Sequence, residues 1–390
     1  MKKYRILTLA TVLIYITYVA AKNIYSTELI EIVRYFNVSK SDASLATSFC
    51  FIGYAVFQLF FIKLIGKINI SRYVLIISPV SAALLAAMPF CTQIWQTWII
   101  MGAVGSLLSG IFPACMLVIS EYLPDSLVPA ANRAMGIGFA VSFALDYFCS
   151  SVFIRIADWK TVFYVLPAVY LASALFFCRA LSGCERRVER GREEQTSAPK
   201  DKKKVFVYLL TAGMTGLLIN MIYYAVSNWV PNLLNEIFGT SPSLSVLITL
   251  LIPLTSAVGA VVCLGICKRL GFVRAAVVLG AGSAAVSVVL SLIYGFSFIV
   301  TLLLVVALLF VARGVAHTVG FQVPVESRDI TEPARAATVI NIFGCVGAAA
   351  GPPAYGALID GSGYGVFFAA AAAAAAVMIV MTVVGRDAVK

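Results

Sequence analysis

Charged side chains are scarce in this chain of 390 residues. Asp, Glu, Lys and Arg together make up 12% of it, whereas 61% of the residues are hydrophobic and the mean hydropathy is +0.96. Soluble proteins carry about 25% charged residues. Because so few charges cannot cover the apolar side chains in water, most of the surface must face lipid. A soluble globular enzyme is therefore excluded.

Residues that hold metals, cofactors or nucleotides are equally scarce. The chain has one histidine, and most of its nine cysteines lie within apolar runs, without the spacing of a disulfide framework or a zinc site. The sequence has no GxxxxGK[ST] segment, so ATP-driven transport by this chain alone is not expected. Its spans contain no nucleophile and base in a recognisable arrangement. We predict no metal, no cofactor and no catalytic residue.

Twelve apolar runs, each long enough to cross a bilayer, form two sets of six. They lie at about residues 6–27, 44–65, 73–92, 95–119, 134–155, 161–180, 205–227, 243–266, 273–294, 297–320, 336–358 and 364–385. Residues 182–204 between the sets are charged and contain Pro and Gly. We predict an all-α membrane protein in which this linker joins two six-helix bundles, residues 1–181 and 205–390.

The distribution of basic residues predicts the topology. Most of the 29 lysines and arginines fall in loops on one predicted side, and the loops of the other side carry only Arg34, Lys40, Arg155 and Lys160. The positive-inside rule then places both termini and the linker in the cytoplasm, in a multi-pass protein of the plasma (cell inner) membrane. Because no soluble module carries a basic face, no nucleic-acid partner is expected.

The two halves resemble copies of each other. The basic pair Lys67 and Arg72 recurs as Lys268 and Arg274, and the Arg133-Ala134 step recurs as Arg335-Ala336 at a similar interval. Two repeated halves can rock about a central site, which is the physical basis of alternating access. The pattern favours a secondary transporter that acts as a monomer, since both halves lie in one chain.

Glycine motifs carry a family resemblance over essentially the whole chain. They are Gly102-x-x-Gly105-x-x-x-x-Gly110-x-x-Pro113, Pro129…Arg133-Ala134-Met135-Gly136 and Gly344-x-x-Gly347…Gly351-Pro352. The chain resembles the major facilitator superfamily, which implies twelve helices in two pseudo-symmetric halves. The usual Asp before the basic pair of loop 2/3 is missing from Gly66-Lys67-Ile68-Asn69-Ile70-Ser71-Arg72. The cytoplasmic latch attributed to that Asp is not carried over.

A weaker resemblance points to the organophosphate:phosphate antiporter branch. It rests on Lys22-Asn23 late in the first span and on the 206–210 segment with Trp229 in the seventh. That branch uses an arginine from each of these helices for phosphate. The matching positions here are Ala21 and Tyr223, so classical phosphate exchange does not transfer.

The first span carries a polar stripe at helical spacing. Tyr18 and Lys22 share this face with other hydroxyl-bearing residues, and Asn23 follows. A lysine within a span costs about 2.5–3.5 kcal/mol unless it meets water or a partner. We expect Lys22, Tyr18 and Asn23 to bind substrate; the alternative for Lys22 is that its stem reaches the headgroups.

Three further ionisable groups lie within predicted spans. Arg313 and His317 are four residues apart and share a helix face, so they form either a substrate site or a structural pair. Asp146 lies near the middle of the fifth span and needs a counter-charge, a proton or a bound cation. We predict that Arg313 and His317 bind substrate, and that Asp146 and His317 carry the coupling proton. Asn220, Tyr223 and Tyr224 of the seventh span are further expected substrate contacts.

These residues predict a transporter of a small organic anion. Lys22 and Arg313 against Asp146 leave a net positive charge within the spans, which suits a sugar phosphate, carboxylate or sugar acid coupled to a proton or an anion. Two alternatives stay open. One is a proton-coupled exporter of drugs or metabolites that depends on Asp146, and the other is a transporter-like sensor that binds without transport.

Overall fold

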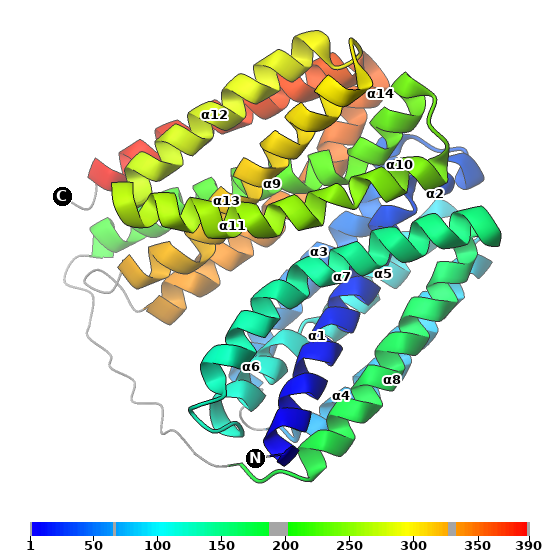
Figure 1. Ribbon diagram of the computed structural model, residues 1–390, viewed down its shortest axis with the longest axis vertical. Coiled ribbons are helices and arrows are strands. Elements are labelled where there is room, and N and C mark those ends of the chain that lie inside the picture. Colours follow the sequence, from blue (N-terminus) through cyan, green and yellow to red (C-terminus); the bar gives the residue numbers. More distant parts are fainter. Residues whose placement is uncertain (1, 65–67, 187–201, 327–332, 388–390) are drawn as a thin grey trace. The chain divides into compact units, whose positions relative to one another are not determined.

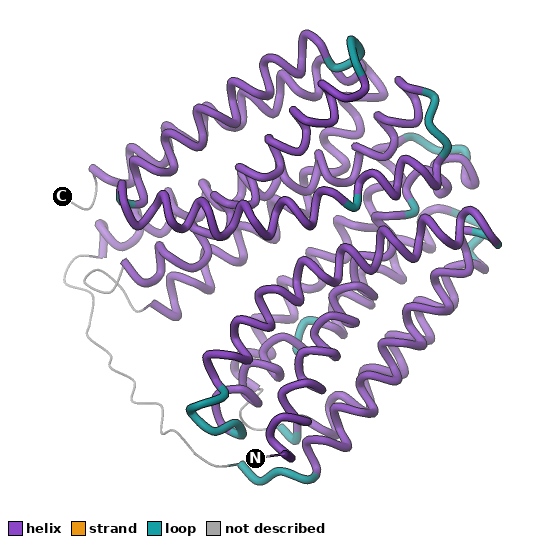
Figure 2. The backbone as a smooth tube through the Cα atoms, in the orientation of Figure 1, coloured by secondary structure: helices purple, strands orange, loops and turns teal. Residues whose placement is uncertain are grey.

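The computed structural model describes residues 2–64, 68–186, 202–326 and 333–387, and these residues form helices joined by short turns, without a strand (Figure 2). This confirms the predicted all-α class. Most of the predicted linker, residues 187–201, lies outside the described residues. The helices are α1 Lys2–Thr27, α2 Leu29–Phe36, α3 Lys40–Leu64, α4 Ile70–Ala87, η1 Met88–Phe90, α5 Ile94–Leu108, α6 Ile111–Glu121, α7 Val128–Ile156, η2 Trp159–Thr161, α8 Val162–Ser182, α9 Lys202–Phe238, α10 Pro242–Thr249, α11 Leu251–Leu270, α12 Phe272–Ile293, α13 Phe298–Glu326 and α14 Pro333–Asp387.

The described chain divides into two compact units. Unit 1 consists of residues 2–38, 45–64, 68–186 and 242–250, and unit 2 of residues 39–44, 202–241, 251–326 and 333–387. Each unit thus includes one short segment from the other half of the sequence: the start of α3 belongs to unit 2 and α10 to unit 1. The domain boundaries at 181 and 205 remain a prediction.

In unit 1, α1 is the central helix, packed against α5, α6, α7 and α8 (Figure 1). Its residues are buried on several faces, including the polar Thr11 and Asn23. Helices α3 and α5 approach so closely that only glycine fits between them. A Cβ on Gly105 would overlap the Cys50 backbone, and one on Gly53 would overlap the carbonyl of Gly102. The glycines of this motif therefore act as a packing surface.

In unit 2, α9 packs along α14 and α13. Here too glycine sets the spacing, since a Cβ on Gly347 would overlap the Leu217 carbonyl and one on Gly351 that of Met221. Inside α14, Gly363 takes a φ of 79°, a value that favours glycine, and interrupts the helical conformation. Residues before and after Gly363 are thus two separate helices.

Ten described helices are long and apolar enough to cross a membrane. One of these stretches, Val339–Val384, has 46 residues and contains the break at Gly363; a straight helix of that length would be about 69 Å long, more than twice a bilayer core. The predicted eighth span is divided into α10 and α11 at Leu250. The apolar helical stretch found there, Pro242–Thr255, is too short to be one of the ten membrane-crossing candidates. The count of twelve remains a prediction.

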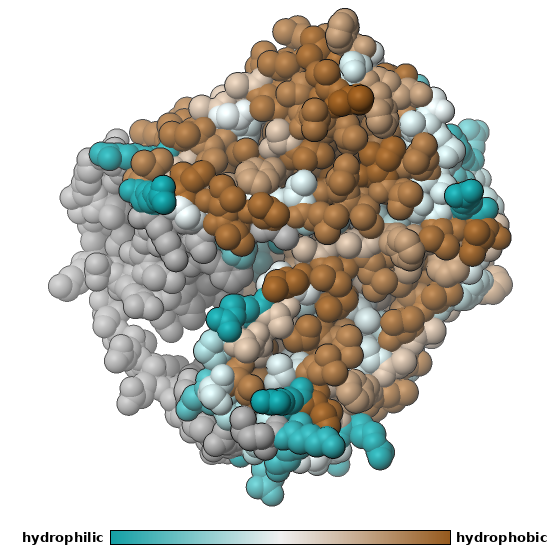
Figure 3. Space-filling view, in the orientation of Figure 1, coloured by the Kyte–Doolittle hydropathy of each residue, from teal (hydrophilic) through white to brown (hydrophobic). Residues whose placement is uncertain are grey.

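The surfaces of both units suit lipid. Many large hydrophobic side chains are exposed, among them Ile76, Ile137, Val261 and Leu292. Figure 3 shows hydrophobic residues spread over the visible faces of α7, α11 and α12, with hydrophilic residues gathered near helix ends. Such wide apolar surfaces are not stable in water, so the structure agrees with a multi-pass membrane protein.

Candidate functional site

Lys22 of α1 lies against two aromatic rings in unit 1. Its Nζ is 4.3 Å from the ring centroid of Tyr54 and 4.9 Å from that of Phe51, both on α3. Both distances are within the range of a cation–π interaction, which contributes roughly 0.5–2 kcal/mol depending on desolvation. Lys22 is half-buried, while both rings are buried. The structure therefore holds the ammonium against the α3 rings instead of leaving it fully exposed.

Tyr18 belongs to the same cluster. Its hydroxyl interacts with that of Tyr54, and its ring meets Tyr15 edge-on with centroids 5.6 Å apart. The structure thus brings Lys22 and Tyr18 together through Tyr54, which lies near both. Asn23 is buried, and its side-chain amide donates to the Val19 carbonyl of its own helix at 2.9 Å. A back-bonded amide of this kind has less capacity left for a ligand.

Arg313 of α13 forms a comparable cluster in unit 2. Its guanidinium carbon is 5.4 Å from the ring centroid of Tyr223 on α9, and Tyr223 meets Tyr224 edge-on at 5.3 Å. Arg313 is half-buried and Tyr223 is buried. His317 lies one turn further along α13 and within electrostatic range of Arg313. The predicted pair and two of the α9 residues therefore gather at one place.

Asn220, the third predicted α9 residue, bonds within its own helix. Its side-chain amide donates to the Gly216 carbonyl at 2.8 Å. It also faces Gly344 of α14, where an added Cβ would lie 3.1 Å from the Asn220 amide nitrogen. This residue therefore helps α9 pack against α14, and its amide oxygen is the group left to accept a hydrogen bond.

Asp146 of α7 lies in a second buried place in unit 1. The side chain is 0% exposed, and neither carboxyl oxygen has a hydrogen-bond partner among the described residues. The charged group that acts on it electrostatically is Glu28, in the turn between α1 and α2. Sequence reasoning missed Glu28, because an acid just after an apolar run resembles an ordinary loop residue.

Glu28 is buried as completely as Asp146. It occupies the N-cap of α2 without a side-chain capping bond, and neither of its carboxyl oxygens has a hydrogen-bond partner in the described part of the chain. Burial raises the pKa of Glu28 to about 8; the Ser150 and Thr27 hydroxyls oppose this shift, while the charges of Glu31 and Asp158 add to it. At neutral pH this carboxyl group is therefore mostly protonated.

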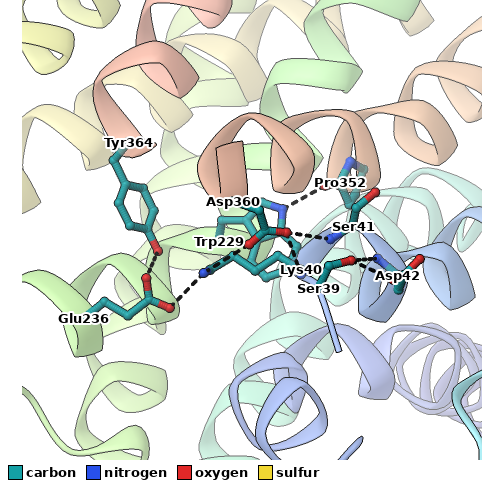
Figure 4. A network of polar contacts seen from close by, with 9 residues as sticks. All are labelled: Ser39, Lys40, Ser41, Asp42, Trp229, Glu236, Pro352, Asp360 and Tyr364. Carbon is teal, nitrogen blue, oxygen red and sulfur yellow. Dashed lines mark hydrogen bonds and ion pairs between the residues drawn. The ribbon is translucent and has the colours of Figure 1, made fainter. Parts of the chain in front are cut away.

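A polar network at the start of α3 lies in unit 2 (Figure 4). The Lys40 ammonium pairs with Glu236 of α9 at 3.1 Å and with Asp360 of α14 at 3.5 Å. Asp360 also accepts from the Lys40 backbone N–H at 2.8 Å, and Glu236 accepts from the Tyr364 hydroxyl at 3.1 Å. Lys40, which the sequence presents as a loop cation, thus ties α3 to both helices.

No group of three or more His, Cys, Asp or Glu side chains in the described parts of the chain is placed to hold a metal ion. The described cysteines are all free thiols, most of them buried. The clusters instead offer two cations on aromatic rings and one pair of acids. Lysine and arginine donors suit anionic oxygens, and buried carboxyl groups within membrane proteins commonly take up protons.

Comparison with known proteins places the chain in a family. Residues 10–352 match the family model of the Major Facilitator Superfamily. A bacterial homolog of the human lysosomal transporter Spinster is 12% identical in its inward-facing, unoccupied structure, with a TM-score of 0.74 over 99% of this chain and 96% of that one. Its occupied structure is 14% identical, with a TM-score of 0.71 over 100% and 96%.

The nucleoside transporter NupG is also similar, with 11% identity and a TM-score of 0.74 over 99% of both chains. No curated protein matches the sequence. Identities this low show a shared fold and say nothing about substrate. The family model nevertheless covers most of the chain, and the helices and glycine contacts agree with it. The chain belongs to the major facilitator superfamily of secondary transporters.

Proposed function

We propose that this transporter moves a small organic anion, such as a sugar phosphate, carboxylate or sugar acid, coupled to a proton or an anion. The supporting observation is that in each unit a half-buried cation on a predicted span lies against an aromatic ring of a neighbouring helix: Lys22 on Tyr54 and Arg313 on Tyr223. A ring face stabilises the cation, and the N–H groups of the ammonium and the guanidinium are charged hydrogen-bond donors. Such donors suit phosphate and carboxylate oxygens.

The resemblance to the organophosphate antiporter branch adds a second argument. At the position where that branch uses an arginine in the seventh span, this chain has Tyr223, and the Arg313 guanidinium of α13 lies over its ring. A guanidinium supplied from α13 replaces the missing charge while the tyrosine orients it. Lys22, next to the other unmatched position Ala21, has the corresponding role in unit 1. We propose that Tyr18, Tyr224, Asn220, Asn23 and His317 complete the anion contacts.

Ligand-dependent stability in detergent is the first test. Thermal unfolding is measured with phosphate, sugar phosphates, carboxylates and sugar acids, and with hydrophobic cations as the opposing panel. A ligand at 100 times its Kd adds about 2.7 kcal/mol to the native state. We expect an anion to raise the melting temperature, and Lys22→Ala and Arg313→Ala to abolish that shift, because each removes a charge-assisted contact.

Lys160→Ala is the matched control. Its ammonium lies 4.0 Å from the Tyr35 ring, so the variant also loses a lysine–aromatic contact, but one remote in the sequence from the predicted sites. Uptake of the stabilising anion into liposomes then tests transport itself. Binding without uptake would favour the sensor. Normal uptake by Arg313→Ala would remove that residue from the site.

A proton-coupled exporter of drugs or metabolites is the second candidate. The observation that favours it is the buried acid pair, Glu28 and Asp146, since uncompensated carboxyl groups attract cations. Stabilisation by hydrophobic cations alone, lost in Asp146→Asn, would establish this reading and overturn the anion proposal.

A further inference from the structure

The two acids of unit 1, Glu28 and Asp146, have nothing to neutralise them in the described structure. Both side chains are 0% exposed, and all four carboxyl oxygens lack a hydrogen-bond partner. Removing an ionised carboxylate from water without a partner costs several kcal/mol even after the protein relaxes. Two like charges at close range add to this cost. The pair is therefore stable only when it binds a positive charge.

A third polar group points to the same place. Ser150 lies one turn after Asp146 on α7, so the two side chains share a face. Its hydroxyl is fully buried, has no hydrogen-bond partner among the described residues, and is near enough to influence Glu28. The packing of α1 on α7 explains this proximity. A Cβ on Gly138 of α7 would touch Ile16 of α1, and Glu28 follows Ile16 by the same number of residues as Ser150 follows Gly138. The hydroxyl is thus available to hold a proton between carboxyl oxygens.

The surrounding charges do not neutralise the pair. The further charged groups that act on Glu28 are Glu31 and Asp158, which are also acids, and Asp146 itself acts on Cys149. Arg34, the basic residue of α2, pairs with Glu31 at 3.7 Å and is half exposed, and the Lys160 ammonium lies over the Tyr35 ring. Glu31 is partly exposed and Asp158 is exposed. The charged groups that act on Glu28 are therefore acids, which make its ionised form less favourable.

From these observations we propose that Glu28 and Asp146 form a proton-binding pair. A proton moves from water to a carboxylate oxygen, and the Ser150 hydroxyl bonds to the oxygens left over. Because the Glu28 charge acts on Asp146, the titrations of the two groups are coupled. As the coupling site of a transporter it rests on the proposed function, whereas proton binding itself does not.

A hydrophobic carbodiimide tests this, because it modifies protonated carboxyl groups in apolar surroundings. The purified protein is labelled between pH 6 and pH 9 and the modified residues are located by mass spectrometry. We expect label on Glu28 or Asp146, falling about tenfold over this range. Glu28→Gln removes its own label and moves the loss of Asp146 labelling to lower pH, because a like charge is removed. Asp125→Asn, at an exposed acid, serves as the control and leaves the profile unchanged.

Two outcomes would overturn the proposal. Absence of label on both wild-type residues at every pH would show that they bind no proton. Protection by Na⁺ at constant pH, with choline as the reference, would assign the site to a metal cation. Wild-type labelling decides the question even if a variant does not fold. Since the assay involves no substrate, a protein that shows the label but transports no anion contradicts the proposed function alone.

Discussion

Glu28→Gln should change how the stability of the protein depends on pH. In the wild type the folded protein keeps the Glu28 proton up to a pKa of about 8, whereas the unfolded chain releases it near the ordinary value for glutamate. Between these values the folded state binds more protons, so stability falls as the pH rises. At 1.36 kcal/mol per unit, the loss between about pH 4.5 and pH 8 is at most about 5 kcal/mol. Glutamine does not titrate and removes this dependence.

Thermal unfolding in detergent between pH 5 and pH 9 measures the effect. We expect the wild-type melting temperature to fall across this range, and that of Glu28→Gln to fall much less, so that the variant is the more stable protein at pH 9. The difference between the two slopes measures the contribution of Glu28, including its effect on Asp146. Asp125→Asn controls for the loss of one carboxylate at an exposed position. Equal slopes in the wild type and Glu28→Gln would refute the reasoning.

Two further predictions concern packing and ion pairs. Lys40→Met removes an ammonium that pairs with two partly exposed carboxylates and belongs to a side chain that is 14% exposed. We expect the free energy of unfolding to fall by only about 1 kcal/mol, because Asp360 keeps its backbone donors. Unchanged stability would mean that water already screens these ion pairs. Gly347→Ala places a Cβ against the Leu217 carbonyl and should cost about 1–3 kcal/mol, whereas Gly282→Ala has open space and should be neutral or slightly stabilising. Equal melting temperatures for the two glycine variants would contradict the packing argument.

Much of the fold could be predicted because lipid imposes a simple rule on the sequence. Every span must satisfy its own backbone, so long apolar runs become helices, and a charged residue within one needs a partner. This rule identified Lys22, Arg313 and Asp146 from the sequence. Segment ends were less predictable: α9 continues to Phe238, about three turns beyond the expected end, and α14 is interrupted at Gly363. These ends depend on local backbone geometry, which hydropathy does not report.

Contacts between helices were predicted less well than the positions of residues along one helix. Spacing along one helix placed Tyr18 and Lys22 on a common face, and Arg313 and His317 likewise, and the structure agrees. Spacing along one helix could not indicate that Tyr54 would lie near both Tyr18 and Lys22, because these contacts join two helices. It also gave no sign that Lys40 would pair with acids of α9 and α14.

The sequence by itself determined that this protein is a helical membrane protein, because composition and apolar runs depend only on the chain and its solvent, and its glycine motifs carried the resemblance to the major facilitator superfamily. The tertiary structure decided which polar groups are buried together. Glu28 follows the last residue of α1 and would be exposed in an isolated helix; it is buried because α2 packs through Leu29, Ile30 and Ile32 and because α7 presents Ser150 and Asp146 to it. The burial that makes it a candidate proton site therefore arises from contacts between distant segments.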